Sequence, residues 1–287
     1  MKLCQFLPVS ILVAALSVPG ILAQQPGKSA PTPAPAAKRI PQAKTQAEYA
    51  DYNASYALNG GATVEQAAND FAAKYPSSEL RVYLYLKALH EYQSENNPAK
   101  MVVVGEKVLS LDPDNAIALV LTATVLADSL SDGDQDREQK IAEIRRNSNR
   151  AFQTVDSSFV PPANATPEQI AAYKATLLSM AHSALGIMEL KTAQDASAEQ
   201  DLRTAANLNK TQPDPYIWYH LALAQDHLAT AMTDKQQQRK KYADALSSAN
   251  QALQYTSANP DLGKLAAAER DRLVQITSPA SSSRNSQ

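Results

Sequence analysis

Apolar residues recur along the middle of the chain in segments of helical length, separated by short polar stretches. Few stretches are rich in β-branched residues that alternate with polar ones, so strands are poorly supported. Alanine and leucine are abundant, and the 287 residues include only eight glycines, a composition of strong helix formers. The pattern predicts about eleven helices, at residues 46–59, 63–75, 78–95, 97–110, 115–130, 136–154, 167–191, 195–208, 214–232, 235–256 and 260–276.

Capping residues mark the starts of several of these helices. An Asn or Asp side chain accepts a hydrogen bond from a free backbone N–H, and a following proline lacks an N–H that the first turn leaves unused. This combination occurs three times, at Asn97-Pro98, Asp214-Pro215 and Asn259-Pro260. Two further starts fit a capping box, Thr63 with Gln66 and Thr166 with Gln169. We expect Gly60 and Gly61 to end the first helix.

The predicted helices form pairs that resemble one another. Small and large apolar residues recur in phase with the caps in the stretches AANDFAAKYP, YLKALHEY and HSALGIME, and again around Trp218 and Leu221. In this respect the chain resembles the tetratricopeptide repeat (TPR) family, in which two antiparallel helices form each repeat. The spacing departs from the family's 34 residues, since Pro76 to Pro113 is 37 residues and Pro213 to Pro260 is 47.

The resemblance implies an all-α fold, an α-solenoid of about five TPR-like helix pairs plus a C-terminal capping helix. A single pair cannot bury its apolar face alone, so the pairs must stack. Small residues such as Gly186, Ala198, Ala222 and Ala245 would let paired helices approach closely. The last helix carries its charges on one side, and we expect it to cover the final apolar face.

In TPR proteins the first helices of the pairs line a concave groove that binds a peptide or a helix. When the groove positions of the family are transferred to the matching positions of these helices, the resemblance implies that the groove contains Tyr83, Leu86, His90, Gln93, Tyr219, His220, Leu223, Asp226 and His227. Tyrosine and histidine offer flat apolar area with a hydrogen-bonding tip, which suits peptide recognition. The family's carboxylate clamp uses Lys and Asn at positions that are mainly Leu, His and Tyr here, so we expect no binding of a C-terminal carboxylate. The alternative is that these side chains simply pack inside the stack.

The two ends of the chain differ from the helical repeat region at residues 47–277. Residues 1–23 have a positive start, an apolar run and a small residue before Gln24, which predicts a secretory signal peptide; a retained membrane anchor is the alternative. Residues 24–46 are rich in Pro and Ala and carry four bases and no acid, which predicts a disordered linker. Residues 278–287 predict a disordered tail. The only cysteine, Cys4, lies in the predicted signal, so the mature chain would form no disulfide.

Charge is unevenly distributed along the chain. Residues 47–277 hold all 29 acidic residues and 21 of the 27 bases, which gives this region a formal charge of −8. An acidic region argues against nucleic-acid binding, because that needs a basic surface.

Candidate chemical sites are few. His220 and His227 are seven residues apart, which separates them by about 10 Å along a helix, so one zinc ion cannot bind both. Four acidic residues have the spacing of the ligands in a calcium-binding loop: Asp132, Asp134, Asp136 and Glu143. Arg137 stands where such a loop needs glycine, so an acidic loop near a helix N-terminus is the preferred interpretation. The chain has no G-x-S-x-G, H-E-x-x-H, P-loop or G-x-G-x-x-G motif.

These observations predict a non-catalytic scaffold or adaptor for protein–protein interaction, exported to the periplasm, the cell envelope or the medium. The stretch FAAKYPSSE also resembles the Tyr-Pro-containing repeats of bacterial envelope-assembly and cell-division TPR proteins. The alternatives are a peptide- or polysaccharide-binding accessory factor of an envelope or secretion assembly and, from another class, a hydrolase with its site in the groove. We expect a protein or peptide partner, no cofactor and no metal, and membrane contact only through the signal segment if it is retained.

Overall fold

The computed structural model describes residues 41–160, 164–210 and 212–278, and these residues form eleven α-helices, one 3-10 helix and no strand. The α-helices are α1 (Gln46–Tyr56), α2 (Gly61–Lys74), α3 (Arg81–Ser94), α4 (Pro98–Leu111), α5 (Ala116–Ser129), α6 (Arg137–Ser158), α7 (Pro167–Lys191), α8 (Asp195–Leu208), α9 (Pro215–Ala231), α10 (Lys235–Gln254) and α11 (Pro260–Thr277). The 3-10 helix, η1 (Thr256–Ala258), lies between α10 and α11.

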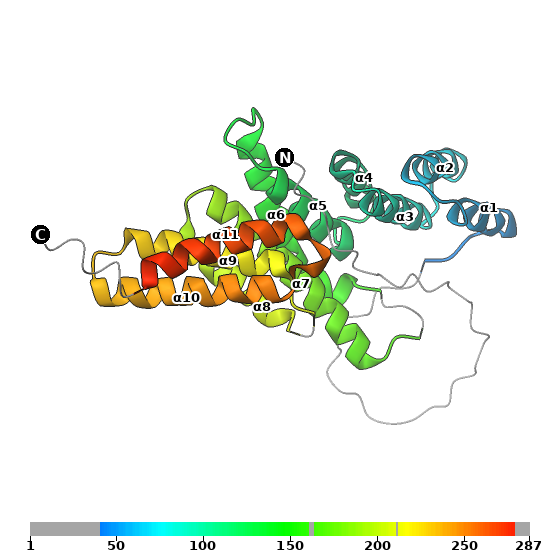
Figure 1. Cartoon of the computed structure of the whole chain (residues 1–287). Coiled ribbons are helices and arrows are strands. Elements are labelled where there is room, and N and C mark those ends of the chain that lie inside the picture. Colours follow the sequence, from blue (N-terminus) through cyan, green and yellow to red (C-terminus); the bar gives the residue numbers. More distant parts are fainter. Residues whose placement is uncertain (1–40, 161–163, 211, 279–287) are drawn as a thin grey trace, which may run out of the picture.

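The helices stack in chain order, and each packs on the helices before and after it (Figure 1). The first helices of successive pairs also touch: α1 with α3, α5 with α7, α7 with α9 and α9 with α11. In Figure 1 the stack runs from α1–α4 at one end to α8–α11 at the other. The all-α prediction is confirmed, and the packed neighbouring pairs are consistent with a solenoid-like helical repeat.

The start of α2 differs from the prediction. Gly60 and Gly61 do not end the first helix, which stops at Tyr56; instead Gly60, with a φ of 86°, is the N-cap of α2. Glu91 Oε2 accepts a hydrogen bond from the Gly60 N–H at 2.9 Å, and Glu95 Oε1 accepts one from the Gly61 N–H at 2.6 Å. Because these carboxylates of α3 cap α2, Thr63 lies inside the first turn and forms no capping box.

The other predicted caps are present. Asn97, Asp214 and Asn259 each accept a hydrogen bond from a first-turn N–H and are each followed by proline. Thr166 and Gln169 form the predicted capping box. These starts depend on residues within four positions of one another, and they were therefore readable from the sequence.

Gly186 marks a close approach of α7 and α8. A Cβ atom built on Gly186 would lie 2.6 Å from Leu202 Cγ and 3.2 Å from the Leu202 backbone nitrogen. Leu202 and its neighbours Ala198 and Ala205 are 0 % exposed. The prediction that Gly186 lets two paired helices approach closely is therefore confirmed.

The second half of the stack has the expected register, with one difference in burial. Leu221 and Ala222 of α9 are buried, and Trp218 is only partly buried, against the apolar cluster that contains Leu221. The final helix, α11, packs on α10 through Leu262 and Leu273, which are buried. As expected of a terminal cap, α11 turns its other side to solvent.

The chain enters the stack beside the α2–α3 loop. Thr45 caps α1 by accepting a hydrogen bond from Glu48 N, and Lys44 Nζ donates to the carbonyl and hydroxyl oxygens of Ser77 at 2.9 and 3.1 Å. The predicted signal peptide, residues 24–40 of the predicted linker and nearly all of the predicted tail lie outside the described residues. Within the described part, no helix is long and apolar enough to cross a membrane.

Candidate binding surface

The predicted groove residues of α3 differ in exposure. Leu86 is buried, and His90, Gln93 and Tyr83 are partly buried. Burial lowers the pKa of His90 below its usual range, and its Nδ1 lies 3.4 Å from Gln93 Oε1. Tyr83 also packs against the apolar core of this end of the stack, so only part of its ring is open to a partner.

The C-terminal end of α3 comes close to α5 and α7 at Gln93. Gln93 borders a small hollow whose other lining residues come from α5 and α7: Ile117, Leu121, Tyr173, Thr176, Leu177 and Met180. The volume of the hollow is about 10 Å³, which is the room of about one water molecule. Side chains of α7 therefore lie close to Gln93, which is partly buried.

On α9, two of the predicted groove residues are buried against other parts of the stack. Asp226 is 8 % exposed, and its Oδ2 lies 2.5 Å from Arg272 Nη2 of α11. His220 is also 8 % exposed, and its Nδ1 donates to the Tyr216 carbonyl oxygen at 2.9 Å. Burial lowers the pKa of His220 to about 4. Asp226 thus joins α9 to α11, whereas the hydrogen bond of His220 stays within α9, and both side chains offer little surface to a ligand.

The other three predicted residues of α9 are more accessible. His227 is half exposed, with Nδ1 3.0 Å from Asp195 Oδ1 of α8, and Tyr219 and Leu223 are partly buried. The α3 and α9 residues do not form one compact site, because α3 and α9 do not pack on each other and α5 and α7 lie between them in the stack.

The acidic loop before α6 has no arrangement suited to calcium. Lys140 Nζ lies 2.9 Å from Asp134 Oδ2 and 3.1 Å from Asp136 Oδ1, and Arg137 pairs with Asp132. Glu143 is turned toward Arg146. Among the described residues, no three His, Cys, Asp or Glu side chains are grouped so that they could hold a metal. The acids of this loop therefore pair with Arg137 and Lys140 at the start of α6.

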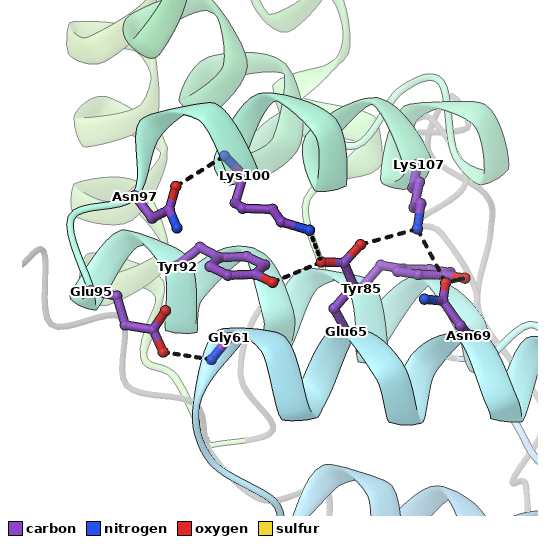
Figure 2. Close-up of polar contacts among 9 residues, drawn as sticks. All are labelled: Gly61, Glu65, Asn69, Tyr85, Tyr92, Glu95, Asn97, Lys100 and Lys107. Atoms are coloured by element: carbon purple, nitrogen blue, oxygen red, sulfur yellow. Dashed lines mark hydrogen bonds and ion pairs between the residues drawn. The ribbon is translucent and has the colours of Figure 1, made fainter.

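A polar network that the sequence analysis missed joins the first two helix pairs (Figure 2). Glu65 of α2 is buried, and its carboxylate accepts a hydrogen bond from the Tyr92 hydroxyl at 2.7 Å. Lys100 and Lys107 of α4 donate to the same carboxylate at 2.9 and 3.2 Å. Burial pushes the pKa of Glu65 up, but the hydrogen bonds from Tyr92 and the two lysines outweigh it and leave the pKa below its usual range.

The two lysines of this network also lie over tyrosine rings. Lys100 Nζ is 5.7 Å from the Tyr92 ring centre, and Lys107 Nζ is 5.4 Å from that of Tyr85, distances suited to cation–π attraction. The tyrosines come from α3, between α2 and α4, so one carboxylate ties three helices. The two tyrosines are seven residues apart in the sequence, and so are the two lysines. This equal spacing is the sequence signal that could have indicated the network.

A second cluster lies where α6, α7 and α8 meet. His182 stacks on Phe152, with ring centres 4.4 Å apart, and its Nδ1 is 2.6 Å from Asp201 Oδ1. Glu189, two turns along α7, also interacts with Asp201. Burial, and then the negative charge of Asp201, raise the pKa of Glu189 to about 7.

We expect this cluster to make stability depend on pH near neutrality. The pKa of Glu189 is raised from 4.5 to about 7 in the folded state. Its contribution to the free energy of unfolding is therefore fully present below pH 4.5 and is lost as the pH rises through about 7. Urea unfolding between pH 5 and 8 should show a decline that is weaker in Glu189→Gln. An identical pH profile for the two proteins would contradict this assignment.

A third cluster connects α5, α7 and α9. Lys191 Nζ donates to the carbonyl oxygens of Ala127 and Asp128 at the end of α5, at 2.9 and 2.6 Å. The Tyr216 hydroxyl donates to Asp128 Oδ1 at 2.8 Å. Burial raises the pKa of Asp128 to about 6. The lysine offsets the partial negative charge of the helix C-terminus, so this cluster serves packing between helix pairs.

Comparison with known proteins gives no relative to which this surface can be matched. No protein family matches the sequence, and no curated protein and no solved structure is significantly similar to the chain.

Proposed function

We propose that this chain is a non-catalytic scaffold, an exported TPR-like repeat protein whose helical stack binds a protein partner. The observation that carries the proposal is the placing of partly exposed tyrosines, Tyr83 and Tyr219, on first helices of separate pairs. Tyrosine side chains contribute strongly to protein interfaces, since they bury a large flat area and keep a hydrogen-bonding tip. The proposed export rests on the composition of residues 1–23.

The structure changes which variants test this proposal. His220 and Asp226 are buried, so replacing them would disturb the fold as well as any interface. Tyr83→Ala and Tyr219→Ala remove partly exposed rings, and Tyr255→Ala is a matched control because Tyr255 is 37 % exposed at the end of α10. All three proteins should keep the same helical circular dichroism.

The experiment is capture of cross-linked partners from the cells that express the chain, followed by binding measurements with each partner identified. We expect Tyr83→Ala or Tyr219→Ala to weaken binding by about tenfold or more, as at interface hot spots, and Tyr255→Ala to bind as the wild type does. Equal binding by all variants would contradict the proposed surface. Turnover of a substrate by the purified chain alone would favour the hydrolase alternative.

A further inference from the structure

The loop between α1 and α2 contains an asparagine that is followed by glycine. Asn59 is exposed in this loop, and Gly60 is the N-cap residue of α2 with a φ of 86°. An Asn-Gly pair is especially prone to spontaneous deamidation, because the residue after the asparagine has no Cβ to hinder attack by its backbone nitrogen. Asparagine is accordingly among the thermolabile residues of proteins. The sequence and the exposure of Asn59 therefore indicate a site of covalent modification.

The reaction at this site needs the backbone nitrogen of Gly60. That nitrogen loses its proton and attacks the side-chain carbonyl carbon, Cγ, of Asn59, so that a new N–Cγ bond forms. The bond between Cγ and Nδ2 breaks, and the side-chain amide takes up a proton and leaves as ammonia. Water then opens the cyclic succinimide at either of its carbonyl carbons, which gives aspartate or isoaspartate. Nothing is oxidised or reduced, and water is the only co-reactant.

The folded chain holds this nitrogen against α3. The Gly60 N–H donates to Glu91 Oε2 at 2.9 Å, and Glu91 Oε1 accepts from Lys87 Nζ, also at 2.9 Å. Burial alone would raise the pKa of Glu91, but these hydrogen bonds outweigh it and leave the pKa below its usual range. Glu95 adds a second carboxylate, which accepts from the Gly61 N–H at 2.6 Å (Figure 2). Negative charge beside the Gly60 N–H opposes formation of the amide anion that must attack.

We propose that Asn59 is a deamidation site that Glu91 keeps unreactive in the folded chain, and that it reacts when the contact between α2 and α3 opens. Isoaspartate carries the backbone through the side chain, which adds a methylene group between residue 59 and Gly60. The Gly60 N–H is then displaced from Glu91, so the modification prevents the contact from closing again. The proposal uses only the contact between α2 and α3 and does not depend on the proposed scaffold function.

Incubation of the purified full chain in mildly alkaline buffer, followed by digestion and mass spectrometry of the fragment that contains Asn59, tests the proposal. A synthetic peptide of residues 56–64 gives the rate without tertiary contacts. We expect the wild type to deamidate at least about tenfold more slowly than the peptide, because a hydrogen bond to a charged acceptor must break first. Glu91→Ala removes this acceptor and should react about three- to tenfold faster than the wild type. Equal rates in the wild type and the peptide, or in the wild type and Glu91→Ala, would overturn the proposal.

The matched control is Glu95→Ala, which removes the carboxylate from the adjacent Gly61 N–H and leaves Glu91 on Gly60. It should accelerate deamidation less than Glu91→Ala does. Equal acceleration by the two variants would attribute the protection to the general stability of the start of α2 and would overturn the role of Glu91. The comparison of wild type with peptide needs no variant, so it tests the protection independently of how the variants fold.

Discussion

Replacing Gly186 with alanine is expected to destabilise the domain by about 1–3 kcal/mol, the usual result of overpacking a close-packed interior. Alanine is the better helix former by about 1 kcal/mol, so a destabilising result would show that the contact outweighs propensity. The added Cβ would lie 2.6 Å from Leu202 Cγ, and Leu202 is fully buried, so α7 and α8 must move apart. Urea unfolding followed by circular dichroism measures the loss.

Two companion variants make this result specific. Gly133→Ala adds the same methyl group where no atom lies within 4 Å, and it should change stability by less than about 0.5 kcal/mol. Leu202→Ala alone should cost about 2–5 kcal/mol through the cavity it leaves. In the double variant the new methyl group occupies part of that cavity, so the combined loss should be smaller than the sum of the single losses. Additive losses would mean that the two residues do not meet.

Replacing Glu65 with alanine is expected to destabilise the domain by about 2 kcal/mol. Breaking a fully buried ion pair costs about 3–5 kcal/mol, and the cost is reduced here because the side chains of Lys100 and Lys107 are 47 % and 37 % exposed and stay hydrated. The Tyr92 hydroxyl loses its acceptor as well. Tyr92→Phe removes one donor only and should cost about 1 kcal/mol.

The stability of Glu65→Gln in acid shows how much of the effect of Glu65 comes from its charge, because glutamine has nearly the same shape and no charge. The pKa of Glu65 is lower in the folded state than in the unfolded state. Its contribution to the free energy of unfolding is therefore present above the unfolded pKa of 4.5 and is lost as the pH falls through the pKa of the folded state. Glu65→Gln should therefore be less sensitive than the wild type to acid below about pH 4.5. If Glu65→Ala and the wild type melted together at pH 7, the network of Figure 2 would have no role in stability.

Local signals made most of the fold predictable. The caps at Asn97, Asp214 and Asn259 depend on adjacent residues, and they placed helix starts correctly. The N-terminus of α2 was misplaced because its caps, Glu91 and Glu95, lie 31 and 34 residues along the chain from the N–H groups that they bind. No pattern within one helix carries that information.

The candidate surface was less predictable for the same reason. The phase of α9 placed Asp226 on the predicted groove face, but Arg272 of α11 pairs with it and Asp226 is buried. Residues of α5 and α7, distant in the sequence, line the small hollow beside Gln93 and leave that side chain partly buried. The exposure of a side chain depends on which helices pack against it. The position of a residue on its own helix therefore cannot tell a binding residue from a packing residue.

The capping of α2 by α3 also sets how the N-terminal end of the stack comes apart. In a repeat array, unfolding spreads according to the strength of each interface between neighbours. Terminal helices usually fray first and alone. Here, unfolding of α3 removes both carboxylates from the Gly60 and Gly61 N–H groups and the Tyr92 hydroxyl from Glu65. We therefore expect α2, α3 and α4, which these contacts join, to unfold together and not one at a time.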